Sequence, residues 1–174
     1  MNEVIKNIMS RRSCRTFDPA KMPSDEAIKQ ITEAGTWSPT SRGMQNPIII
    51  AVTNKQLRDK IMKMNAEVMG APNTDPFYGA PCILIVLVKE SPNAVYDGSI
   101  VLQTMMLAAE SLGLNTCWIH RAKEEFESNK GKEILKQLGI EGEYVGVGHL
   151  ALGYTSAPIP EPKARKDNYV VWAK

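Results

Sequence analysis

Apolar side chains recur three or four positions apart in several stretches of this chain, a spacing that predicts amphipathic helices. Ser24 and Asn54 are the N-cap residues expected before two of these helices. The most apolar helix is expected to begin at Asp97 and to end at Gly113. It is apolar around most of its circumference, which predicts a place in the core or in a subunit interface. The predicted helices span residues 2–10, 24–36, 54–70, 97–112 and 123–138.

Shorter apolar runs predict four strands, over residues 48–53, 82–88, 115–119 and 144–154. The run at 82–88 is unbroken, as in a strand buried on both faces, and the run at 144–154 alternates glycine with apolar residues, which indicates close packing. Two helices precede the first strand, an order that does not suit a simple doubly wound domain. The pattern therefore predicts an α/β or α+β fold in which one mixed or antiparallel sheet lies under helices.

The polar connections and the end of the chain complete this pattern. Residues 38–47 and 70–81 are rich in proline, glycine, hydroxyl and amide groups, and we interpret both as loops. Residues 155–174 form a tail with three prolines and a final apolar run, Tyr169–Trp172. We expect this tail to extend onto a partner subunit. Because no repeat or linker interrupts the chain, residues 1–174 are predicted to form a single domain.

The composition and charge of the chain exclude several classes of protein. The 174 residues include 21 Lys and Arg against 19 Asp and Glu, a formal net charge of +2, and 43% are hydrophobic. These values exclude a disordered chain and a polybasic protein whose partner is any polyanion. Three cysteines without a CxxC pair and only two histidines predict a reducing compartment and no metal site. The first residues lack the apolar core of a signal peptide, so the expected location is the cytoplasm.

Candidate functional residues are most concentrated in the basic segment Arg11-Arg12-Ser13-Cys14-Arg15, which follows the first predicted helix. Guanidinium groups match the oxygens of phosphate or carboxylate, so the segment is a candidate anion site, and the alternative is a solvated charged face. A second basic cluster, Lys163, Arg165 and Lys166, lies in the tail. Two such clusters in a nearly neutral chain are compatible with one focused anion site, although spacing alone leaves their convergence open. We interpret Cys14 as a spacer.

The polar loop, residues 38–47, offers hydroxyl, amide and backbone N–H groups without a general base. That inventory suits the polar edge of a ring system, and an ordinary helix-to-strand connection is the alternative. His120 ends a predicted strand, where ligand sites often lie, and a structural histidine is an equal alternative. The glycine motifs of dinucleotide-binding domains, P-loops and serine hydrolases are absent.

In their order and spacing, these segments resemble the nitroreductase family of FMN-dependent oxidoreductases over nearly the whole chain. The basic segment, continued through Thr16-Phe17, resembles the family's R-R-S-x-R-x-F/Y signature. The other matches, in chain order, are Ser38-Pro39-Thr40-Ser41 through Gln45, Gly79-Ala80-Pro81, Asp97, Gly113 through Ile119, and Gly153-Tyr154 before the basic tail. Gly43 and Ile48 depart from the family, which often has asparagine and an aromatic residue at these positions.

The resemblance implies an α+β three-layer sandwich and an intertwined homodimer with exchanged tails. It implies an enzyme that moves hydride from NAD(P)H through bound FMN to nitroaromatics, quinones or related acceptors by a ping-pong mechanism. No side chain is expected to be catalytic, because the flavin carries the chemistry. The basic segment and the tail would bind the phosphate, the partner's polar loop would meet the ring, and the strand end at Ile119 would approach it. The implied cofactor-binding residues are Arg11, Arg12, Ser13, Arg15, Pro39, Thr40, Ser41, Gln45, Ile119, His120, Lys163 and Arg165.

Two other functions fit part of the pattern. A flavin-binding or redox-sensing protein with little turnover would share the same motifs. A nucleic-acid-binding module would use the two basic clusters, but the near-neutral charge and the 6% aromatic content argue against it.

By analogy with the family, Arg15 is our candidate for stabilising the negative charge of the reduced ring.

Overall fold

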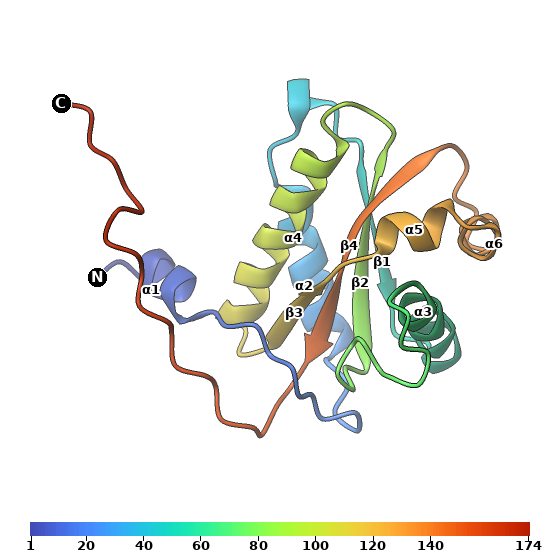
Figure 1. Ribbon diagram of the computed structural model, residues 1–174, viewed down its shortest axis with the longest axis horizontal. Coiled ribbons are helices and arrows are strands. Elements are labelled where there is room, and N and C mark those ends of the chain that lie inside the picture. The colour runs from blue at the N-terminus through green and yellow to red at the C-terminus, as the bar shows by residue number, and fades with distance from the viewer.

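The computed structural model describes residues 1–174, which form a sheet between two layers of helices (Figure 1). The helices are α1 (Glu3–Ser10), α2 (Asp25–Thr36), α3 (Lys55–Val68), α4 (Ala94–Ser111), α5 (Ala122–Glu127) and α6 (Asn129–Gln137). The strands are β1 (Pro47–Val52), β2 (Cys82–Lys89), β3 (Asn115–Ile119) and β4 (Tyr144–Gly153). Ser24 and Asn54 cap α2 and α3 as predicted, because their side-chain oxygens accept the N–H groups of Ala27 and Leu57.

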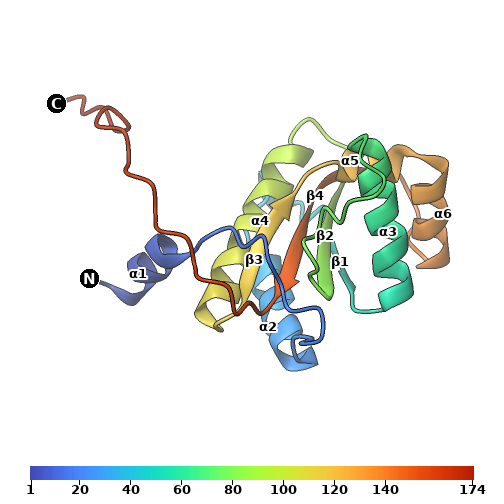
Figure 2. The same ribbon diagram turned by 60° about the horizontal axis from the view of Figure 1, so that its bottom comes forward.

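The four strands form one antiparallel sheet in the order β1-β2-β4-β3. Helices α2 and α4 cover one face, and α3, α5 and α6 cover the other, as two views of the molecule agree (Figures 1 and 2). The central strand β2 is buried from Cys82 to Val88, which confirms the prediction of a strand covered on both faces. Its residues alternate between two cores. Ile83, Ile85 and Leu87 join the core beneath α3 and α5, and Leu84, Val86 and Val88 join the core beneath α2 and α4.

The most apolar helix begins earlier than predicted. Helix α4 starts at Ala94, whose N–H donates to Ser91 O at 3.1 Å, so Asp97 lies within its first turn. The reason for the difference is that Asp97 does not cap its own helix. It is buried, and its carboxylate accepts a hydrogen bond from the polar loop. Gly113 ends the helix as predicted, with a φ of +72°.

The single helix predicted over residues 123–138 is wrong, because the structure has two helices there, α5 and α6. The chain is extended at Ser128, whose hydroxyl accepts the N–H of Gly131 at 3.1 Å and donates to Glu125 O at 2.6 Å. Gly131 lies directly against the backbone of Glu125, where a Cβ would clash. Both helices bury side chains in the same core, which is why their apolar spacing is that of one helix.

Glycines of β4 confirm the predicted close packing of this strand. Gly146 lies against the backbone of Ala122, and Gly148 lies against the indole of Trp118, so a Cβ at either position would overlap its neighbour. Bare backbone at these positions therefore lets α5 and β3 approach β4 closely.

Helix α1 and the tail lie on the same side of the molecule in both views (Figures 1 and 2), and α1 is joined to α4 through Asn7 Nδ2, which donates to Leu107 O at 2.8 Å. Helix α1 buries none of its residues, and its apolar side chains Val4, Ile5, Ile8 and Met9 are 48–65% exposed. Residues 155–174 contain no helix or strand, and their apolar end is also exposed. Of the helices in the structure, none combines the length and the apolar character needed to cross a membrane.

Candidate functional site

The basic segment runs along the outer edge of β3. Ser13 forms an isolated parallel bridge with Thr116, and Cys14 N donates to Thr116 O at 2.9 Å. Cys14 and Phe17 are buried and fix the segment to the core, while Arg15 is exposed. Because side chains alternate along extended backbone, the burial of Cys14 turns Ser13 and Arg15 outward. The basic segment is therefore held in place, and the interpretation of Cys14 as a spacer agrees with its burial.

The guanidinium groups of Arg11 and Arg12 differ in their partners. Arg12 Nη1 donates to Met9 O at 2.6 Å and to Arg11 O at 2.8 Å, so this side chain closes the C-terminal end of α1. Arg11 Nη1 is buried and has no hydrogen-bond partner. A buried cationic donor without a partner is costly, and an oxyanion is the group that satisfies it best. Arg11 thus offers a cationic donor that an anion would satisfy.

A cavity of about 220 Å³ lies between the basic segment and the first part of the tail. Its lining residues are Arg12, Ser13, Cys14, Arg15, Thr16, Thr155, Ala157, Pro158, Ile159 and Pro160. The structure therefore brings together two segments from opposite ends of the sequence. Lys163 and Arg165 lie farther along the exposed tail, outside this lining, and Arg165 Nη1 donates to Lys163 O at 2.9 Å. Their approach to the basic segment stays a prediction.

The polar loop is held against α4 by side chains that sequence reasoning did not single out for this role. Asp97 Oδ1 accepts Ser41 N at 3.0 Å, and Asn93 Nδ2 donates to Ser41 Oγ at 2.7 Å. Within the loop, Thr40 Oγ1 accepts Gln45 N at 3.0 Å, and Gln45 has a φ of +52°. An acidic residue four positions after Asn93, in an otherwise apolar helix, was the available signal. The loop thus has a defined shape and presents polar groups from a fixed base.

The polar loop and the basic segment do not share a cavity within one chain. Thr40 and Gln45 line a separate cavity of about 510 Å³ with residues of α2, β1 and α4. Pro39 is exposed, and Ser41 is half-buried. This separation is the arrangement required if the loop serves the site of another subunit.

The end of β3 presents Ile119 and His120 differently. Ile119 is buried and His120 is exposed, with the His120 ring 6.0 Å from the Trp118 ring, centroid to centroid. The carbonyl of His120 accepts a hydrogen bond from Asn65 Nδ2 at 2.8 Å. Asn65 was missed in the sequence, although an asparagine four residues after Ile61, on the apolar face of a predicted helix, is a signal of a buried polar contact.

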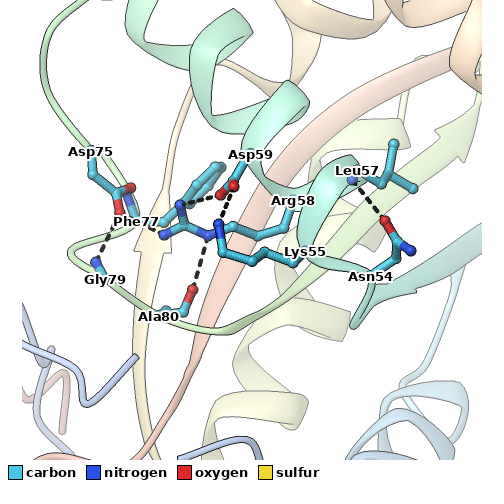
Figure 3. Close-up of polar contacts among 9 residues, drawn as sticks. All are labelled: Asn54, Lys55, Leu57, Arg58, Asp59, Asp75, Phe77, Gly79 and Ala80. Atoms are coloured by element: carbon cyan, nitrogen blue, oxygen red, sulfur yellow. Dashed lines mark hydrogen bonds and ion pairs between the residues drawn. The ribbon is translucent and has the colours of Figure 1, made fainter. Parts of the chain in front are cut away.

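The loop at residues 70–81 is fixed by Arg58 of α3 (Figure 3). The buried Arg58 guanidinium donates to Ala80 O at 3.0 Å and to Asp75 Oδ2 at 2.6 Å. Asp75 in turn accepts the N–H groups of Phe77 and Gly79. Because Phe17 N donates to the carbonyl of Tyr78 at 3.1 Å, this loop also supports the chain just after the basic segment.

The cysteines are buried and unpaired. Burial raises the pKa of Cys82 to about 12, and burial is also the main cause that raises the pKa of Cys117, against the opposing charges of Arg15 and Arg11. Both thiols therefore stay protonated at neutral pH and are poor nucleophiles there. No group of three or more His, Cys, Asp or Glu side chains is placed to hold a metal ion.

Known proteins share this fold and sequence pattern. The nitroreductase family model matches residues 8–154. A nitroreductase structure with bound FMN from Bacteroides fragilis has a TM-score of 0.88 and 26% identity, and one with bound FMN from Desulfitobacterium hafniense has a TM-score of 0.87 and 29% identity. Each covers 100% of both chains. The NAD(P)H FMN reductase of Bacillus subtilis is 30% identical over 139 residues, 67% of this chain and 53% of that protein. These matches confirm the predicted α+β sandwich.

Proposed function

Because this chain belongs to the nitroreductase family, we propose that it passes hydride from NAD(P)H through bound FMN to small acceptors by a ping-pong mechanism, with nitroaromatics and quinones as the acceptor class. The family and its FMN-containing relatives make the chain an FMN-dependent NAD(P)H oxidoreductase. The acceptor class and the ping-pong order are the parts that this proposal adds.

The observation that carries the cofactor assignment is the unpartnered, buried Nη1 of Arg11. A phosphate group that reached this donor would satisfy it, and Ser13 and Arg15, which line the cavity between the basic segment and the tail, offer a hydroxyl and a second guanidinium. The residues present therefore fit the FMN phosphate. When bound, FMN supplies the hydride chemistry, and the protein supplies binding, orientation and charge.

Each candidate residue has a role in this arrangement. Arg11, Ser13 and Arg15 hold the phosphate and the adjacent ring edge, while Arg12 keeps the basic segment joined to α1. Ile119 and His120 border the ring at the end of β3. Lys163 and Arg165 close over the phosphate from the tail. Pro39, Thr40, Ser41 and Gln45 meet the ring from the partner subunit.

A homodimer is the assembly that completes this site. Helix α1 and the end of the tail expose apolar side chains that a monomer leaves in water, and the polar loop opens onto a cavity separate from the basic segment. A second copy would cover the apolar surface and would also supply the missing ring contacts. Three free, buried cysteines suit the reducing cytoplasm as its location.

The test is cofactor binding followed by turnover. The purified protein, given FMN, should show flavin bands near about 370 and 450 nm that bleach with NAD(P)H under anaerobic conditions and return with a nitro compound or quinone. Absence of the bands overturns the cofactor assignment. Bands that do not bleach support a flavin-binding protein with little turnover instead.

Arg11→Ala is expected to weaken FMN binding about tenfold or more, since a charge-assisted hydrogen bond to phosphate is lost. Lys6→Ala is the matched control, because it removes an exposed cation of α1 whose partner is Glu3.

Arg15→Ala should lower the reduction potential of bound flavin, because a nearby cation favours the reduced ring. An unchanged potential with FMN retained would exclude that role for Arg15.

A further inference from the structure

The connection from β3 to α5 turns sharply at His120 and Arg121. Arg121 has φ +79° and ψ 5°, a left-handed conformation that is strained for a residue with a Cβ. Strain of this kind persists only where surrounding contacts hold it, and such positions cluster at functional sites.

One buried amide holds both residues of the turn. Asn65, on α3, is fully buried, and its Nδ2 donates to His120 O at 2.8 Å. Its Oδ1 accepts the Nε of Arg121 at 2.9 Å. The two ends of a single side chain therefore contact consecutive residues and set the direction in which the backbone leaves β3.

The orientation of this amide is determined by its neighbours. Nδ2 of Asn65 also donates to Glu125 Oε1, and a carboxylate can only accept, whereas a guanidinium can only donate. The oxygen of Asn65 must therefore face Arg121, and the nitrogen must face Glu125 and His120 O.

Glu125 also contacts the core on its far side. It is buried, and its Oε2 lies 3.2 Å from Nε2 of the fully buried His149 in β4, although neither atom has a partner in hydrogen-bond geometry. The His149 ring packs against the rings of Phe77 and Phe126, at centroid distances of 5.3 and 6.3 Å. The chain of contacts from the core to the turn runs His149, Glu125, Asn65 and Arg121.

We propose that Asn65 is a positioning residue for the redox reaction, which holds the His120–Arg121 turn in its left-handed form beside the flavin ring. The buried Glu125 carboxylate, which accepts from Asn65 Nδ2, orients the Asn65 amide for this purpose. This inference rests on the proposed function, in which Ile119 and His120 border the ring. The alternative is that Asn65 only joins α3 to α5.

Two substitutions of Arg121 separate these roles, because both leave Asn65 Oδ1 equally without its donor. Arg121→Ala and Arg121→Gly both remove the guanidinium, so charge changes equally. Only glycine adopts a φ of +79° without strain. We expect Arg121→Ala to shift the midpoint potential and the visible circular dichroism of bound FMN, and Arg121→Gly to stay closer to wild type in both. Equal values in the two variants would overturn the proposal.

Asn65→Ala tests the amide itself in the FMN-loaded protein. Its dissociation constant for FMN should rise about tenfold, the equivalent of a buried hydrogen-bond partner lost, and the flavin potential should shift. In the double variant with Arg121→Gly, the potential should return toward that of Arg121→Gly alone. A merely structural asparagine predicts no such rescue.

The matched control is Asn54→Ala, which removes the N-cap of the same helix. It should lower the thermal midpoint and leave the flavin potential unchanged. If wild type binds FMN and Asn65→Ala keeps the wild-type potential and spectrum, this inference fails and the proposed function stands. If wild type takes up no FMN, both fail.

Discussion

At the scale of single residues, burial shifts the pKa of the cysteine thiols more than nearby charges do. Cys117 lies where Arg15 and Arg11 favour its thiolate, yet burial dominates and the pKa of the thiol rises. Cys82 on β2 has no such charges around it and its pKa rises to about 12. A thiol that keeps its proton in the folded state and loses it more easily when unfolded makes stability depend on pH.

Cys82 should make the protein less stable in alkaline solution. Its ordinary pKa is 9.0 and its folded pKa is about 12, so the stabilisation is complete below pH 9 and is lost as pH rises toward 12. Between pH 8 and pH 10.5, wild type should lose about 2 kcal/mol more free energy of unfolding than Cys82→Ala. Denaturant titrations under reducing conditions measure the difference. Parallel pH profiles for the two proteins would contradict the assignment.

At the scale of elements, local patterns locate helices and strands, and contacts between elements set their limits. Caps at Ser24 and Asn54 act within one turn, so they are visible in the sequence. The break at Ser128 depends on Gly131 touching the backbone of a preceding helix, so the apolar spacing of residues 123–138 conceals it. The loop at residues 70–81 likewise takes its shape from Arg58, which lies on another element.

Removing the Arg58 side-chain charge should destabilise the protein through this loop. Arg58→Met keeps the apolar length but leaves Asp75 and the Ala80 carbonyl without their partner, and the expected loss is about 3 kcal/mol. Lys55→Met is the control on the same helix, because its ion pair with Asp59 is exposed and should contribute at most about 0.5 kcal/mol. Urea unfolding measures both (the two side chains appear together in Figure 3). Equal losses would show that the Arg58–Asp75 pair does not hold the loop.

At the scale of the whole molecule, helices cover both faces of the sheet, whereas the apolar side chains of α1 and of the tail are exposed to solvent. Val171 and Trp172 are 87% and 79% exposed, and α1 buries nothing. Exposed apolar groups at the two chain ends, outside the core, are typical of surfaces that meet another subunit. The two segments proposed to contact the cofactor, the polar loop and the basic segment, likewise line separate cavities of one chain.

The tail should therefore control assembly. We expect the wild-type protein to be a dimer by light scattering, and the double variant Val171→Asp, Trp172→Asp to shift toward monomer and to bind FMN more weakly. Lys174→Asp adds a negative charge to the same exposed tail and serves as the control. A monomeric wild type, or a double variant as dimeric as the control, would contradict a role of the tail in the interface.

Most elements of this fold, and the residues of its basic segment and polar loop, could be read from the amino-acid order. Helical spacing, end caps and turn residues act over a few positions, and the family motifs lie in short runs. The contacts that shape the site join residues far apart, such as Asn65 and His120, separated by 55 positions. Which distant side chains meet depends on how whole layers pack, and the pattern along the chain does not contain that information. The order of residues therefore specified the elements and the chemistry, whereas packing determined that Arg11 lacks a partner, that Asn65 holds a strained turn, and that loop and basic segment face different cavities.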